Sequence, residues 1–240
     1  MRTQTVLAAT PVIQPGFADP VHDAQACFRI ILDAMALPCK PVSLPTTPPA
    51  AHLATAIAAP LLAGFVSVAL ALCDAETPVW LDESLDTPAM RRHLRFHCGC
   101  PLATDPEEAA FAFIGNARAM PRLGRFNAGT AEYPDRSATL VIGVRWDEPG
   151  VPRIASGPGI PPGQYPLGLP FSPAGLPCRF WNDWADCHTA YPLGVDAIFM
   201  GTNPAREDAT LVAGFPRTVS LFAPGIAAGG GKEKNTCMSR

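Results

Sequence analysis

A stretch without any charged side chain runs from Pro41 to Cys73 and constrains the fold more than any other feature of this chain. Its part from residue 53 to residue 73 exceeds the roughly 18 apolar residues that make a membrane-spanning helix a candidate. Alanine is frequent in it, Pro60 interrupts it, and Lys40 is its flanking cation, without an aromatic belt. We therefore expect a buried core helix over residues 61–72 and no membrane partner.

The overall composition is that of a globular protein with many turns. Apolar residues make up 48% of the chain and charged residues 16%, which excludes an intrinsically disordered chain. The net charge of −3 gives no basic field for nucleic acid, so we expect no such partner. The chain is too long and too apolar for its eight cysteines to indicate a small domain held together by disulfides. The first ten residues, MRTQTVLAAT, do not have the pattern of a secretory signal. We expect a reduced, cytoplasmic protein.

The sequence divides into three parts. Residues 1–16 are expected to be a flexible leader, residues 17–223 a single α/β domain, and residues 224–240 a disordered tail. Within the domain, residues 149–177 hold nine prolines and six glycines, which predicts a long loop.

Strands alternate with helices along the domain, which favours an α/β class. Asp19-Pro20 begins the first helix, Pro38 ends it, and we expect its buried face to be formed by Phe28, Ile31, Leu32 and Met35. Two more helices are expected from Thr87-Pro88 and from Phe180. Apolar runs predict strands at 77–81, 110–114, 138–144, 151–155, 195–200, 210–212 and 217–221.

Four residues are the candidates for chemistry on a small anion. Arg29 and Arg217 carry the guanidinium fork that suits phosphate or carboxylate. His97, next to an arginine, suits an acid, a base or a phosphate donor. Asp196 begins a strand and either orients a cation or caps a turn. For Arg217 the alternative is a structural ion pair with Asp196.

No metal or nucleotide motif is convincing. His97-Cys98-Gly99-Cys100 offers zinc ligands, but the other local pair, Cys187-His188, has the wrong spacing for a four-ligand site, so we expect no metal. Gly229–Lys232 lacks the remaining residues of a phosphate loop, and no Gly-x-Ser-x-Gly elbow is present.

Several segments together resemble one family, the PhnH subunits of the bacterial carbon–phosphorus lyase system. They occur in the family's order and lie in Phe17–Met35, Asp74–Trp80, Leu94–His97, Gly157–Ile160, Pro192–Asp196 and Phe215–Thr218. One departure is Cys39, which stands where the family usually has glycine after the proline that ends the first helix.

The resemblance implies a three-layer α/β fold like the large domain of pyridoxal-phosphate-dependent transferases. It also implies a homodimer that joins PhnG, PhnI and PhnJ and that, with PhnG, PhnI and PhnL, supports formation of ribose-1-phosphonate 5-triphosphate from ATP and a phosphonate. Pyridoxal chemistry needs a lysine that forms a Schiff base with the cofactor. The lysine inside the predicted domain is Lys40, which lies in a proline-bounded loop after the first helix. We therefore expect no cofactor. The alternative is a stand-alone enzyme acting on a small phosphate or phosphonate.

Overall fold

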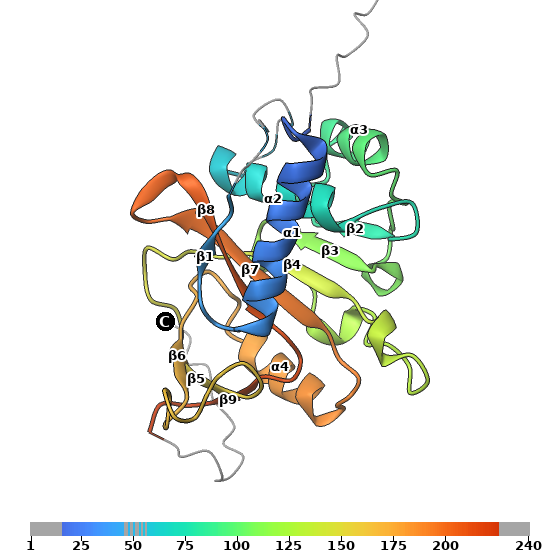
Figure 1. Ribbon diagram of the computed structural model, residues 1–240. Coiled ribbons are helices and arrows are strands. Elements are labelled where there is room, and N and C mark those ends of the chain that lie inside the picture. The colour runs from blue at the N-terminus through green and yellow to red at the C-terminus, as the bar shows by residue number, and fades with distance from the viewer. Residues whose placement is uncertain are drawn as a thin grey trace, which may run out of the picture.

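A computed structural model describes residues 16–225, apart from residues 46, 47, 49, 51, 52, 54 and 56 (Figure 1). The α-helices of this part are α1 (Pro20–Ala36), α2 (Ala59–Leu72), α3 (Pro88–His97) and α4 (Phe180–Thr189), and short 3-10 helices lie at Pro106–Glu108, Ala117–Ala119, Leu123–Arg125 and Pro134–Arg136. Its strands are β1 (Val42–Ser43), β2 (Val79–Leu81), β3 (Phe111–Ile114), β4 (Thr139–Gly143), β5 (Arg153–Ser156), β6 (Leu169–Phe171), β7 (Asp196–Asn203), β8 (Arg206–Phe215) and β9 (Ser220–Phe222). The predicted leader lies almost wholly, and the predicted tail largely, outside the described residues.

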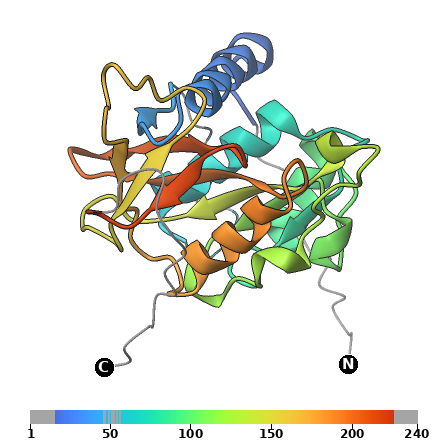
Figure 2. The ribbon, with the colours of Figure 1, turned by 90° about the horizontal axis from the view of Figure 1, so that it is seen from below.

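A six-stranded mixed sheet forms the middle layer. Its order is β1-β8-β7-β4-β3-β2, in which β2, β3, β4 and β7 run parallel and β8 and β1 run antiparallel to their neighbours. Helices α1, α2 and α3 cover one face, and α4 lies against the other, as the two views show (Figures 1 and 2). The second face is also covered by a small antiparallel sheet of order β6-β5-β9. The predicted α/β class is confirmed.

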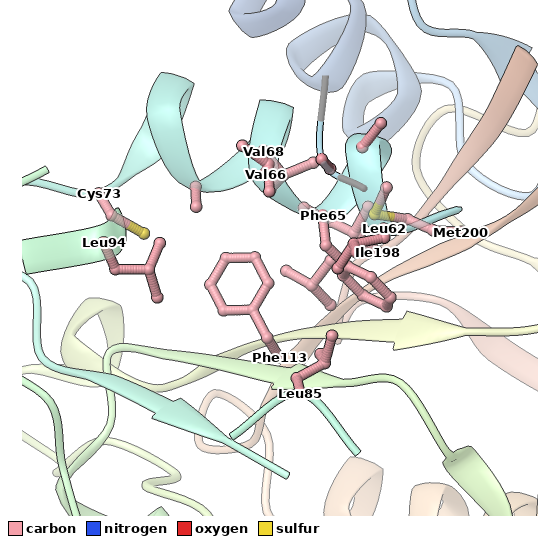
Figure 3. Close-up of a cluster of buried hydrophobic side chains, with 14 of the residues drawn as sticks. Leu62, Phe65, Val66, Val68, Cys73, Leu85, Leu94, Phe113, Ile198 and Met200 are labelled. Atoms are coloured by element: carbon pink, nitrogen blue, oxygen red, sulfur yellow. The ribbon is translucent and has the colours of Figure 1, made fainter. Parts of the chain in front are cut away.

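The charge-free stretch forms the buried helix that the sequence predicts. In α2 every residue from Leu62 to Ala69 is buried, and Phe65 meets Phe113 of β3 edge to face with ring centroids 6.2 Å apart (Figure 3). Gly64 lets α2 lie close to β8, because a Cβ there would lie 2.6 Å from the side chain of Thr210. None of the helices in the described part of the chain has both the length and the apolarity needed to cross a membrane.

The local signals for helix ends are also confirmed. The carboxylate of Asp19 accepts hydrogen bonds from the backbone N–H groups of the first turn of α1, and Thr87 caps α3 in the same way. The strands predicted from apolar runs all appear, with ends shifted by a few residues.

The predicted buried face of α1 is wrong in part. Ile31 is buried, together with Cys27 and Ala34, but Phe28 and Leu32 are 45% and 54% exposed. The face of α1 that packs on the sheet is therefore rotated from the face that the apolar spacing favours. Small side chains allow this packing: a Cβ on Gly214 of β8 would lie 2.3 Å from the carbonyl oxygen of Ala34, so α1 and β8 are in close contact.

The loop expected over residues 149–177 also needs a correction, because it contains β6 in addition to β5, the strand that the run 151–155 predicts. Proline is excluded from strands that donate hydrogen bonds on both sides. Here Pro170 lies in β6, which is an edge strand paired with β5 alone. An edge strand tolerates the missing N–H group, so proline content alone does not exclude a strand there.

Candidate functional site

Two of the four candidate residues, Arg217 and Asp196, form an ion pair at the start of β7, an interior strand of the main sheet. The Arg217 guanidinium donates to both carboxylate oxygens of Asp196, at 3.2 Å from Nε and 2.5 Å from Nη2. The Arg217 backbone N–H donates to the same carboxylate at 2.8 Å. The two side chains are only 15% and 20% exposed. The ion pair with Asp196, which the sequence left open as the structural role of Arg217, is therefore present.

The remaining donors of Arg217 are also engaged. Nη1 donates to the carbonyl oxygens of Pro134 (2.8 Å) and Pro192 (3.3 Å), and Nη2 donates to the hydroxyl of Ser137. A guanidinium has five N–H donors, and together these bonds occupy all five. An anion could bind to Arg217 only by displacing one of these partners.

The position of this pair in the sheet also argues against a catalytic role. Asp196 is the first residue of β7 and lies opposite Thr139, the first residue of β4. Ser137 precedes β4. The pair therefore lies at the amino ends of the parallel strands, whereas open α/β sheets bind their ligands outside the carboxyl ends.

A serine–histidine pair lies beside Arg217, and the sequence analysis missed it. His188 Nδ1 is 3.0 Å from the carbonyl oxygen of Arg217, and Nε2 is 3.1 Å from the hydroxyl of Ser220. Because a carbonyl only accepts, Nδ1 carries the proton and Nε2 accepts from Ser220 in the neutral ring. The contact resembles a nucleophile–base pair, but it also joins α4 to β9 across the turn that holds Arg217.

At the carboxyl ends of the parallel strands lies a buried carboxylate, that of Asp82. It directly follows β2 and is 7% exposed. Its carboxylate accepts from the Ser84 hydroxyl (2.7 Å), the Leu85 N–H (3.1 Å) and, across the sheet edge, the Asn116 N–H (2.8 Å). In the sequence, Asp82 directly follows an apolar strand, and this pattern could have identified it as a candidate residue. Its bonds tie the loops after β2 and β3 together.

His97 lies at the end of α3, away from the Arg217 pair. It is half-buried, and its ring is 4.3 Å from that of His93 and 4.9 Å from that of Phe96. The following thiols are also packed: the hydrogen bond with Cys100, together with burial, raises the pKa of Cys98 well above its ordinary value. No three His, Cys, Asp or Glu side chains among the described residues come together as a metal site would require.

Arg29 and Lys40 lie on or near α1. Arg29 is exposed on the outer side of the helix, and the ion pairs found in the described part of the chain do not include it. The Lys40 ammonium lies over the ring of Tyr165, 5.3 Å from its centroid. The structure thus brings Asp196 and Arg217 together and places Arg29 and His97 on other elements.

Comparison with known proteins identifies a family and a curated relative. The profile of the family "Bacterial phosphonate metabolism protein (PhnH)" matches residues 15–221. A protein of Rhizobium meliloti (strain 1021), named "Alpha-D-ribose 1-methylphosphonate 5-triphosphate synthase subunit PhnH", is 38% identical over 214 residues, which are 89% of this chain and 98% of that protein.

Proposed function

Because this chain belongs to the PhnH family of bacterial phosphonate metabolism proteins, we propose that it is a subunit of the assembly that makes an α-D-ribose 1-phosphonate 5-triphosphate from ATP and a phosphonate. The observation that carries the proposal is the 38% identity to the Rhizobium subunit over nearly its whole length. Its partners are then PhnG, PhnI and PhnJ, with PhnL supporting the reaction, and the chain also pairs with itself. Its place is the cytoplasm, and residues 17–223 act as one domain.

In this proposal the chain contributes structure and surface to the assembly, without completing a reaction alone. The full engagement of Arg217 and the separation of Arg29 and His97 from it support this role. The packed interior supports it too: the void between α2, α3 and the sheet measures about 10 Å³ and is lined by apolar side chains, so it has no room for a phosphonate.

The fold, in this proposal, is that of a pyridoxal-phosphate transferase large domain that has lost its cofactor chemistry. The mixed sheet covered by helices on both faces is compatible with that ancestry. Lys40 supports the loss, because it lies in the loop after α1 and its ammonium packs on Tyr165. The purified chain should therefore show no absorbance of an internal aldimine, and such a band that disappears in Lys40→Ala would overturn this part of the proposal.

The proposal is tested in the chain's own bacterium. Deleting the gene should abolish growth on methylphosphonate as the phosphorus source but not on inorganic phosphate, and a tagged copy should restore growth and co-purify with PhnG, PhnI and PhnJ. The purified chain alone should not convert ATP and methylphosphonate. Unimpaired growth of the deletion strain would refute the subunit role, and turnover by the chain alone would favour the stand-alone enzyme.

A further inference from the structure

Two cysteines separated by one glycine lie where α3 ends. Cys98 is the C-cap of α3, and Gly99 has a φ of 67°, the left-handed conformation that commonly follows a helix. The turn brings the two side chains together, and the thiol of Cys98 donates a hydrogen bond to the sulfur of Cys100. The proposed function gives this pair of thiols no role.

The pair lies between the ends of two helices. The sulfur of Cys98 is 3.6 Å from the carbonyl oxygen of Ala69 in α2, and the sulfur of Cys100 is 4.0 Å from that of Leu94 in α3. Thiols are weak donors and both contacts are long, so no strong partner holds the two sulfurs apart. Figure 3 shows Cys73, the C-cap of α2, beside Leu94. A third thiol therefore lies near the same junction.

The surroundings of this pair favour a thiolate, which is the reactive form of cysteine. The hydrogen bond from Cys98, together with the positive charge of Arg95, lowers the pKa of Cys100. Burial and the charge of Asp74 oppose this effect. By contrast, burial raises the pKa of Cys27 to about 12, which makes that thiol inert. Cys98 is only half-buried, so the pair is open to solvent on its side.

We propose that Cys98 and Cys100 form a reversible dithiol–disulfide site whose oxidant is a small hydroperoxide. The Cys100 thiolate attacks one oxygen of hydrogen peroxide, the O–O bond breaks, and hydroxide leaves, so Cys100 becomes a sulfenic acid. The Cys98 sulfur then attacks the Cys100 sulfur: the S–S bond forms, the S–O bond breaks, and the oxygen leaves as water with the proton of Cys98.

The atoms and electrons of this reaction balance. The hydroxide takes up the proton that Cys100 had released, so two thiols and one hydrogen peroxide give one disulfide and two water molecules. The two sulfurs together lose two electrons, and the peroxide gains them. Two molecules of a small thiol reverse the reaction by exchange and become a disulfide themselves. We favour Cys98 over Cys73 as the partner of Cys100, because the hydrogen bond already joins those two sulfurs.

The inference does not depend on the proposed function, and mass spectrometry of the purified full chain tests it without any partner subunit. Trypsin releases residues 96–118 as one peptide that carries Cys98 and Cys100 and no further cysteine, whereas Cys73 lies in the peptide of residues 30–91. After treatment with hydrogen peroxide and alkylation of the remaining thiols, the peptide 96–118 should be unalkylated and lighter by two hydrogen atoms. Dithiothreitol should restore both thiols. The disulfide should form at least about tenfold faster than exposed Cys178 is oxidised.

Three variants separate the pair from the other thiols. Cys98→Ser and Cys100→Ser should each abolish the disulfide, and Cys178→Ser is the matched control, which should form it at the rate of the wild type. Circular dichroism checks that the variants are folded, and the wild-type measurement decides the proposal even if one of them is not. The proposal is overturned if the peptide 96–118 keeps both thiols under conditions that oxidise Cys178. A link from this peptide to the peptide 30–91, or cysteines that dithiothreitol does not restore, would also overturn it.

Discussion

Replacing Arg217 by alanine should destabilise the isolated chain strongly. The change removes all five donors of the guanidinium. Two carbonyl oxygens and the Ser137 hydroxyl lose this partner, and the Asp196 carboxylate keeps from Arg217 only the backbone N–H bond. Breaking a buried ion pair from one side costs about 3–5 kcal/mol. Because the two side chains are 15% and 20% exposed to solvent, we expect a somewhat smaller loss in the free energy of unfolding, about 2–4 kcal/mol. For a domain of this size, that loss lowers Tm by roughly 5–15 °C.

Urea unfolding of a double-mutant cycle measures the interaction itself. Arg217→Ala, Asp196→Ala and the double variant should show a coupling energy of about 1–3 kcal/mol, since the two residues share bidentate hydrogen bonds. Arg217→Lys should recover only part of the loss, because an ammonium cannot reach both the carboxylate and the carbonyl oxygens. Arg145→Ala is the control: its pair with Glu148 is about half exposed on both sides and should contribute less than about 1 kcal/mol.

One result would refute this reasoning. If Arg217→Ala unfolds at the urea concentration of the wild type and yet fails to assemble with PhnG, PhnI and PhnJ, the guanidinium serves binding and the ion pair is incidental. If stability falls while the surviving folded protein still assembles, Arg217 is a structural residue.

Three further changes test the packing. Gly64→Ala should cost about 1–3 kcal/mol, because its Cβ would lie 2.6 Å from a side-chain carbon of β8, whereas Gly124→Ala meets nothing within 4 Å and should stay within about 1 kcal/mol of the wild type in urea unfolding. Cys39→Val should lower Tm and Cys39→Gly should not, because residue 39 has a φ of 65°, which a β-branched side chain resists; equal Tm values would contradict this. Raising the pH from 8 to 10 should lower the free energy of unfolding, because burial raises the pKa of Cys27 to about 12, so only the unfolded chain loses that proton above about pH 8.5. Cys27→Ala should reduce this slope by about 1 kcal/mol per pH unit, and exposed Cys178→Ala should leave it unchanged.

The sequence predicted those features that depend on local chemistry. A charge-free stretch must be buried, so α2 was predictable without knowing what would cover it. Asp19 and Thr87 mark helix starts through bonds to their own first turns. The φ of 65° at Cys39 is one that glycine adopts without strain, and glycine is the residue that the family resemblance leads us to expect there.

Features that depend on distant segments could not be predicted in this way. The acceptors of Arg217 come from residues up to 83 positions away, so no spacing rule identifies them all. The apolar residues of α1 lie on two adjoining faces, one with Cys27 and Ile31 and one with Phe28 and Leu32. Their spacing alone does not indicate which of these faces packs on the sheet. That choice depends on the close approach of the Ala34 backbone to Gly214, which the pattern of apolar positions does not contain.

The two ends of the parallel sheet bear on the function together. A group that acts on a substrate must keep a donor, a lone pair or a proton free to face it. Arg217, at the amino ends, has no unused donor, and Asp82, at the carboxyl ends, uses three of its about four acceptor sites on Ser84, Leu85 and Asn116. Asp82 and Arg217 thus hold the loops between strands in place. A chain arranged in this way is better suited to present fixed surfaces than to open a site of its own, which supports the proposed role of a subunit.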